Sequence, residues 1–160
     1  MTLAADAVQA LRRRGWTLGV AESLTGGAVA AEIVSVSGAS AVLLGGVVAY
    51  ATPVKHTVLG VDAELLAAHG PVHAAVALQM AEGVRDAVKV DGRAADVGVS
   101  TTGIAGPDSP DGQPVGTVHV AVVTPEESCA EAHLFAGDRA QVRAQSVAAA
   151  LDLLHRMTRE

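Results

Sequence analysis

The chain has 160 residues, 50% hydrophobic and 18% charged, so it can bury one core and does not resemble a disordered sequence. The formal net charge of −6, with one Trp, one Tyr and one Phe, argues against direct nucleic-acid binding, which needs positive charge or several stacking rings. Cys129 is the single cysteine, which excludes an internal disulfide and favours a reducing, cytoplasmic setting.

The sequence also argues against a membrane location. The amino terminus places its basic residues after its apolar ones, the reverse of a secretory signal. The longest apolar run, residues 41–51, is far shorter than the ~20 residues that span a bilayer. We therefore expect no membrane contact and one domain over residues 1–160. The largely apolar, Ala- and Val-rich composition leads us to expect a homo-oligomer.

Helical and strand patterns alternate along the first half of the chain. Apolar residues at helical spacing predict a helix that starts at Leu3 and stops at Gly15, after an arginine cluster. Next, a strand, a helix, a second strand and two short helices are expected over residues 16–21, 25–36, 42–50, 52–60 and 62–69. Gly45 and Gly46, inside the second strand, indicate a β-bulge or a close backbone approach.

The second half of the chain contains consecutive strands. The expected elements are a long helix, a strand, a loop, two strands and a final helix, over residues 72–88, 94–101, 101–114, 115–123, 130–135 and 138–157. This pattern predicts an α/β fold: a single-domain three-layer α/β/α sandwich with a mixed, largely parallel sheet.

The stretch AESLTGG, residues 21–27, is a candidate site because it lies between a predicted strand and a predicted helix. Ligands of α/β sheets bind beyond the carboxyl ends of the strands, where Ser23 would lie. Thr25 can cap the helix, which leaves the N–H groups of Gly26 and Gly27 for a phosphate or an oxyanion. Alternatively, Ser23 and Thr25 are only turn and cap residues, since the stretch matches no general nucleophile or phosphate motif.

Lys55 lies in the first turn of a predicted short helix, with Thr52 as N-cap and Pro53 in the first position. The positive end of a helix dipole disfavours a cation, so we expect a lowered pKa for this amine, and burial would lower it further. A neutral lysine beside a serine can deprotonate that serine for nucleophilic attack. The alternative is a solvated surface lysine.

The segment TTGIAGP, residues 101–107, is a second candidate for a ligand-binding loop. Gly103 and Gly106 flank two small apolar residues, and backbone of this kind can line a pocket without side-chain bulk. A loop that merely turns the chain is the other interpretation.

Arg139 and Arg143 lie four residues apart near the start of the last helix, so they share one helical face. Two guanidiniums beside a helix N-terminus can clamp a phosphate, although both can equally be solvated arginines. The six histidines, at positions 56, 69, 73, 119, 133 and 155, show no zinc-binding spacing, and we expect neither a metal nor a cofactor.

Several stretches in the same order resemble the CinA C-terminal domain family of competence-damage-inducible proteins. They read AESLTGG, LGGVVAYATPVK, TTGIAGP, PVGTVHVAV and GDRAQVRAQSV, and the likeness extends from about Trp16 to the last helix. The resemblance implies a metal-free nicotinamide-nucleotide amidohydrolase, which hydrolyses nicotinamide mononucleotide to nicotinic acid mononucleotide and ammonia. It places the family's serine on Ser23 and its lysine on Lys55.

The expected mechanism follows from that resemblance. Lys55 takes the hydroxyl proton of Ser23, Ser23 attacks the carboxamide carbon, and backbone amides hold the oxyanion. The expected contacts in the substrate pocket, including those amides, come from Glu22, Thr25, Gly26, Gly27, Thr102, Gly103, Ile104, Ala105 and Gly106.

Four side chains complete the expected site. Tyr50 would orient Lys55 or contact the pyridine ring. Glu22 would position the ribose hydroxyls or orient Lys55. Arg139 and Arg143 would bind the nucleotide phosphate.

The sequence departs from the family pattern at two places. Leu24 stands where many relatives have Cys, and Asp108, Ser109 and Asp111 replace a glycine-rich run, which would alter the lip of the pocket. Two other functions stay open: a non-catalytic nucleotide- or partner-binding module associated with competence or DNA repair, and an amidohydrolase acting on a related amide.

Overall fold

The computed structural model of the chain describes residues 1–110 and 112–160, so Asp111 lies outside the described residues. The elements in chain order are α1 (Leu3–Arg14), β1 (Leu18–Glu22), α2 (Ala28–Val34), the 3₁₀ turn η1 (Ala39–Ala41), β2 (Leu43–Val48), α3 (Thr52–Thr57), α4 (Ala63–His69), α5 (Ala74–Ala87), β3 (Val97–Gly103), β4 (Thr117–Val123), β5 (Ser128–Leu134) and α6 (Arg139–Thr158). Within these residues, no helix combines the length and apolar content needed to cross a bilayer.

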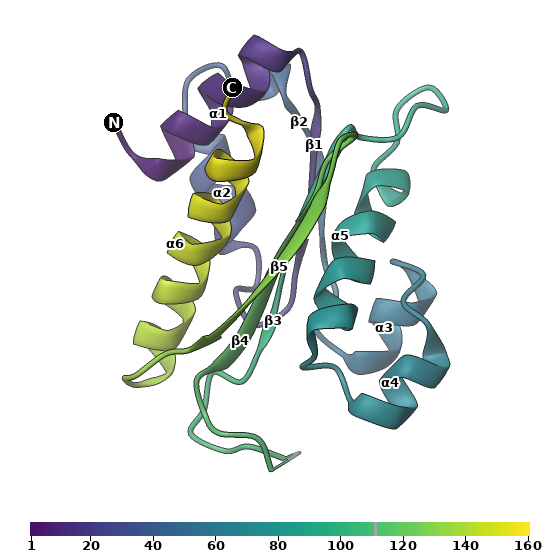
Figure 1. Ribbon diagram of the computed structural model, residues 1–160, viewed down its shortest axis with the longest axis vertical. Helices are drawn as coiled ribbons and strands as arrows, with labels where there is room; N and C mark the ends of the chain where they lie inside the picture. Colours follow the sequence, from purple (N-terminus) through teal and green to yellow (C-terminus); the bar gives the residue numbers. More distant parts are fainter. Residues whose placement is uncertain (111) are drawn as a thin grey trace.

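The five strands form one mixed sheet in the order β2-β1-β3-β4-β5. β1 pairs in parallel with β2 and β3, whereas β3 with β4 and β4 with β5 pair antiparallel. Figure 1 shows the sheet between two helical layers, with α1, α2 and α6 on one face and α3, α4 and α5 on the other. The predicted three-layer α/β sandwich is confirmed, and its parallel part is confined to the three strands that lead toward the site.

The two faces of the sheet bury different side chains. Branched residues such as Val99, Val120 and Leu154 fill the larger core beneath α1 and α6. On the other face α5 lies very close to the strands: a Cβ on Gly98 would stand 1.8 Å from the carbonyl oxygen of Ala81. Such an approach requires glycine, and it fixes the height of α5 above the sheet.

The strand boundaries differ from the predicted ones where backbone pairing between strands extends a strand into a segment whose composition predicts a loop. β3 continues to Gly103, which pairs with Val118 of β4, so the loop predicted over residues 101–114 starts only after Gly103. The register between β1 and β2 moves from Leu18–Leu43 to Gly19–Gly45, in agreement with the predicted bulge.

Two helix starts also differ from the prediction. α2 begins at Ala28, not Thr25, because Gly26 and Gly27 have φ of 60° and 106°, values that interrupt a right-handed helix. α3 includes Thr52 as its first residue and is preceded by Ala51, so Thr52 is not the N-cap.

Candidate active site

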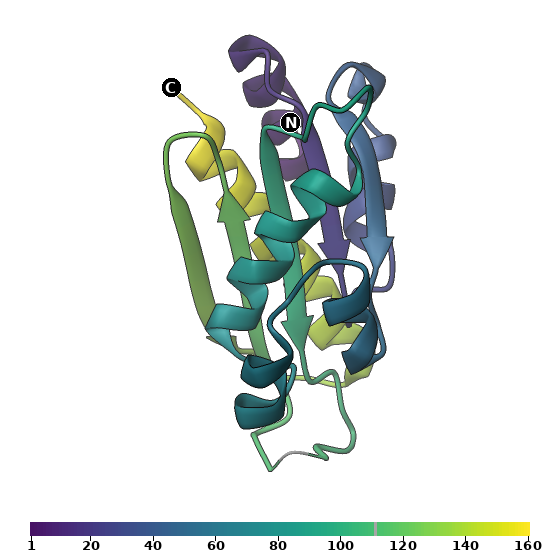
Figure 2. The same ribbon diagram turned by 90° about the vertical axis from the view of Figure 1, so that its right-hand side faces the viewer.

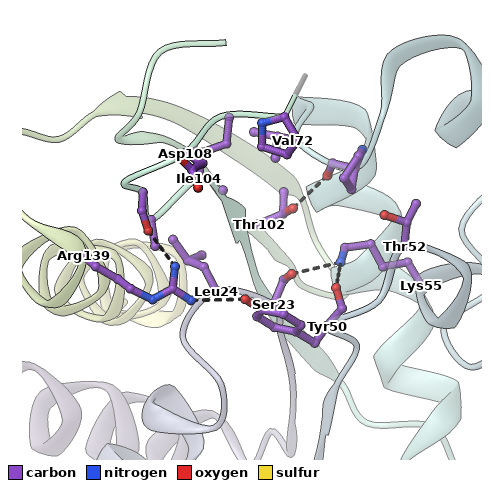
Figure 3. A pocket seen from close by; sticks show the side chains of 15 residues that line it. Ser23, Leu24, Tyr50, Thr52, Lys55, Val72, Thr102, Ile104, Asp108 and Arg139 are labelled. Carbon is purple, nitrogen blue, oxygen red and sulfur yellow. Dashed lines mark hydrogen bonds between the residues drawn. The ribbon is translucent and has the colours of Figure 1, made fainter. Parts of the chain in front are cut away.

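Ser23 lies immediately after β1, where the parallel part of the sheet ends and a cavity of about 480 Å³ opens. This size suits a small organic ligand. The wall of the cavity is formed by Ser23, Leu24, Tyr50, Thr52, Lys55, Pro71, Val72, Thr102, Gly103, Ile104, Ala105, Gly106, Asp108, Pro110 and Arg139 (Figure 3). The site therefore collects the turn after β1, α3 and the residue before it, the connection between α4 and α5, the end of β3 with the loop that follows it, and the start of α6.

Ser23 and Lys55 are in direct contact inside this cavity. The Nζ of Lys55 lies 2.9 Å from the Oγ of Ser23 (Figure 3). Lys55 is only 1% exposed and Ser23 only 7% exposed. The predicted proximity of the hydroxyl and the amine is thus present in the structure, on two segments 32 residues apart.

The other contacts of Lys55 Nζ are backbone carbonyls. The amine donates to the carbonyl oxygen of Ala49 at 2.7 Å and to that of Tyr50 at 3.3 Å. A neutral amine has two hydrogens and one lone pair. With both hydrogens on carbonyls, the lone pair faces Ser23 and can accept its hydroxyl proton.

Burial lowers the pKa of Lys55 from 10.5 to about 8. The direction agrees with the prediction, and so does one of its two predicted causes, burial. The other predicted cause, the helix dipole, does not apply, because the residue stands in the last turn of the six-residue α3, away from the positive end of the helix. No carboxylate forms an ion pair with Lys55 among the described residues. The amine can therefore be neutral near physiological pH.

Two buried threonines support the segment that carries Ser23. The Oγ1 of Thr101 lies 3.4 Å from the backbone N of Ser23, which donates to it, and 2.8 Å from the Oγ1 of Thr25. Both threonines are fully buried and neither lines the cavity. Thr25 thus holds the turn after Ser23 from behind, and its predicted substrate contact is wrong.

Glu22 also has a different role from the predicted one. Its two carboxylate oxygens accept from the backbone N–H groups of Val29 at 2.9 Å and Ala30 at 3.0 Å. The side chain is buried and stays outside the cavity wall, because the side chains of successive strand residues point to opposite faces. Glu22 therefore caps the start of α2 and does not reach Lys55 or a ribose.

The two predicted glycine segments differ in position. Gly26 and Gly27 do not line the cavity, and the N–H of Gly26 donates to the carbonyl oxygen of Ser23. The segment from Gly103 to Gly106 does line it. Within the described part of the chain, no hydrogen bond occupies the backbone N–H of Ala105 or Gly106.

Arg139 and Arg143 separate in the structure. Arg139 lines the mouth, where its guanidinium donates to the carbonyl oxygen of Gly106 at 2.7 Å and to the Tyr50 hydroxyl at 3.2 Å (Figure 3). Arg143 donates to the carbonyl oxygens of Leu24 at 2.9 Å and Thr25 at 3.2 Å, outside the cavity wall. Of the two arginines predicted to bind a phosphate together, only Arg139 therefore lies on the cavity wall, and Arg143 holds the turn after Ser23.

Tyr50 contacts Lys55 through its backbone. Its side chain is 61% exposed and lines the mouth, where its hydroxyl meets Arg139. Lys55 is oriented by the carbonyl oxygens of Tyr50 and Ala49, contacts that no side-chain motif could reveal.

Sequence reasoning missed several residues that build the site. Thr52, Pro71, Val72, Asp108 and Pro110 line the cavity, and Asp108 is its one carboxylate among the residues described. The order of residues along the chain does not show which loops meet in space. Of these five residues, only Asp108 stood out in the sequence, as a departure from the family pattern. In the same described ranges no three His, Cys, Asp or Glu side chains are arranged to hold a metal ion.

Fold and site together define an α/β domain with a buried serine–lysine pair at the carboxyl end of its parallel strands. A family model for the CinA C-terminal domain matches residues 1–158. The chain belongs to the CinA C-terminal domain family.

Proteins of known sequence and structure agree with this assignment. The chain is 51% identical over 149 residues to a CinA-like protein of Anaeromyxobacter, covering 92% of this chain and 35% of that protein. It is 45% identical over 147 residues to a CinA-like protein of Frankia casuarinae, covering 92% and 33%. The chain thus spans about a third of the length of these relatives.

Solved structures match over nearly their whole length. A CinA-superfamily protein of Klebsiella pneumoniae superimposes with a TM-score of 0.90 at 34% identity, covering 98% of this chain and 95% of that one. One from Escherichia coli gives a TM-score of 0.88 at 31% identity, with 96% and 88% covered.

Proposed function

We propose that the protein is an amidohydrolase that converts nicotinamide mononucleotide and water into nicotinic acid mononucleotide and ammonia. The observation that carries the proposal is the 2.9 Å contact between Lys55 Nζ and Ser23 Oγ inside a cavity. The resemblance of the surrounding motifs to the CinA family supplies the substrate.

In the first half of the proposed reaction, neutral Lys55 accepts the proton of the Ser23 hydroxyl as the Oγ attacks the carboxamide carbon. The backbone N–H groups of Ala105 and Gly106 are the donors proposed for the oxyanion. The C–N bond then breaks, and the proton held by Lys55 passes to the leaving nitrogen, which departs as ammonia. An ester between Ser23 and the nicotinoyl group remains.

In the second half, water hydrolyses that ester. Lys55 accepts one proton from the attacking water and returns it to the oxygen of Ser23 as the ester bond breaks. The products are the nicotinic acid form of the mononucleotide and the original enzyme. Every proton transfer uses the same amine, because no other base among the described residues contacts the Oγ of Ser23.

The cavity mouth suggests how a nucleotide would lie. With the carboxamide at Ser23, the ribose phosphate would extend toward Arg139, the one arginine on the described cavity wall. Its guanidinium donates to the Gly106 carbonyl and the Tyr50 hydroxyl, and no carboxylate of the described residues forms an ion pair with it. Asp108, on the same wall, is suited to accept from ribose hydroxyls, the role first expected for Glu22.

Ammonia release from nicotinamide mononucleotide by the pure protein tests the proposal. We expect turnover by the wild type and its loss in Ser23→Ala and Lys55→Ala. Lys89→Ala is the matched control, because Lys89 is the other lysine and lies exposed at the end of α5. Wild-type rates in both site variants would refute the serine–lysine assignment, and a wild type that binds the nucleotide without turnover would instead indicate a non-catalytic binding module.

A further inference from the structure

Thr102 brings a buried hydroxyl into the cavity beside Ser23. In the parallel pair of β1 and β3, Ala21 lies opposite Ser100, whose hydroxyl donates to α5. Because side chains alternate along a strand, Thr102 points to the same face as Ser100, the face that α5 covers in Figure 2. Ser23 follows Ala21 by two residues, and Figure 3 shows both hydroxyl side chains in the cavity wall.

The hydroxyl of Thr102 is fixed as a hydrogen-bond acceptor toward the cavity. A threonine hydroxyl has one hydrogen and two lone pairs. Thr102 donates its hydrogen to the carbonyl oxygen of Pro71 at 2.7 Å (Figure 3). If the hydroxyl turned its hydrogen toward a ligand, this carbonyl would lose the bond, which costs free energy. The oxygen therefore presents lone pairs, and no hydrogen, to a bound molecule.

We propose that Thr102 accepts a hydrogen bond from the NH₂ group of the substrate carboxamide and thereby selects an amide over the corresponding carboxylic acid. The inference rests on the proposed amidohydrolase function and deepens it. The carboxamide oxygen faces the N–H groups of Ala105 and Gly106, while its nitrogen lies between Thr102 and Lys55, the amine that protonates it as it leaves. Donors thus meet the oxygen of the amide, and an acceptor meets its nitrogen.

The same hydroxyl opposes binding of the acid product. An ionised carboxylate has no hydrogen to donate, so one of its oxygens would face the lone pairs of Thr102 where the amide nitrogen had been. Two facing acceptors repel each other, and the repulsion is relieved only if Thr102 gives up its bond to Pro71. The site therefore holds the amide more tightly than the acid, which favours release of the product after hydrolysis.

Binding to the Ser23→Ala protein tests the inference without turnover. Calorimetric titration gives Kd for nicotinamide mononucleotide and for nicotinic acid mononucleotide at pH 9, where Lys55 is mostly neutral and does not attract a carboxylate. Adding Thr102→Val should lower the preference for the amide, measured as the ratio of the two Kd values, by about three- to tenfold. The amide loses a hydrogen bond, and the acid loses a repulsion. Adding Thr102→Ser instead, which keeps the hydroxyl, should leave the ratio unchanged.

The ratio of the two Kd values separates recognition from a structural effect. If loss of the Thr102–Pro71 bond only loosened the cavity wall, both ligands would bind more weakly and the ratio would stay the same. Thr102→Ala is a second variant without the hydroxyl, and circular dichroism checks the fold of each. A ratio within about twofold of the parent in both variants would overturn the inference and leave the amidohydrolase proposal intact. That proposal fails separately, and the inference with it, if protein with Ser23 releases no ammonia from the mononucleotide.

Discussion

At the scale of single residues, the site contains a lysine whose pKa is lowered by its surroundings. Lys55 has two carbonyls and one hydroxyl as partners, and burial alone lowers its pKa to about 8. A carboxylate partner would have raised that pKa and kept the amine protonated. Sequence indicated both residues of the pair, but neither the burial that lowers the pKa of Lys55 nor the backbone carbonyls that orient its amine have a sequence signature.

The rate of amide hydrolysis should therefore rise with pH. Below a pKa of about 8 the amine is mostly protonated and cannot accept the Ser23 proton. We expect kcat/KM to increase about tenfold per pH unit below pH 8 and to level off above it. Lys55→Arg, which stays protonated, should lose at least ~100-fold at every pH. A flat wild-type profile between pH 6 and 9 would contradict the role of Lys55 as the base.

The two arginines of α6 should behave differently when each is replaced by methionine. Arg139→Met should raise KM for the mononucleotide by about ten- to a hundredfold, corresponding to a lost charge-assisted contact of ~1.5–3 kcal/mol. On nicotinamide riboside, which has no phosphate, the loss should be much smaller and should come only from the freed carbonyl of Gly106.

Arg143→Met, by contrast, should lower kcat on both substrates, because it frees the carbonyls of Leu24 and Thr25 beside Ser23. Steady-state kinetics on both substrates separates the two effects. Equal losses on both substrates for Arg139→Met would exclude its contact with the phosphate.

At the scale of elements, the turn from β1 into α2 is the part of the site that sequence predicted least well. Thr25 and the two glycines were expected to serve the helix start and the ligand. The structure instead caps α2 with Glu22 and bonds Thr25 to Thr101 of β3. Glu22 caps α2 from the strand that precedes it, and its position relative to the helix depends on how the chain turns between the two. A fixed sequence spacing, such as that of an ordinary N-cap residue, therefore does not predict this contact.

Glu22→Gln should destabilise the protein. The amide keeps one acceptor oxygen, while its NH₂ group would face a backbone N–H that then has no partner, and the favourable charge at the helix start is lost. We expect a decrease of ~1–3 kcal/mol in the free energy of unfolding, measured by urea denaturation. Glu32→Gln, on the exposed face of the same helix, should change it by less than ~0.5 kcal/mol. Similar small effects for both would contradict the capping role.

At the scale of the whole molecule, the fold was largely predictable and the composition of the cavity was not. The alternation of helix and strand patterns along the chain predicts the three layers, and the adjacent Gly45 and Gly46 predict the bulge in β2. The walls, however, come from both helical layers. Ser23 follows β1, Lys55 belongs to α3, and Arg139 starts α6. Their convergence depends on the strand order, in which β1 lies between β2 and β3, and long-range pairing of this kind is not encoded in any local stretch.

Because the cavity is assembled from distant segments, a bound ligand should stabilise the entire native state. Ser23→Ala removes turnover but leaves Arg139 and the loop from Gly103 to Gly106, so it should bind nicotinamide mononucleotide as a stable complex. At a ligand concentration a hundred times Kd, binding adds ~2.7 kcal/mol, which corresponds to a rise in Tm of about 5–10 °C for a domain of this size. Thermal unfolding should show this shift for the mononucleotide and a much smaller one for free nicotinamide. Adding Arg139→Met to Ser23→Ala should reduce the first shift and leave the second unchanged. Identical shifts for both ligands would mean that the cavity recognises only the pyridine carboxamide and that the ribose phosphate lies outside it.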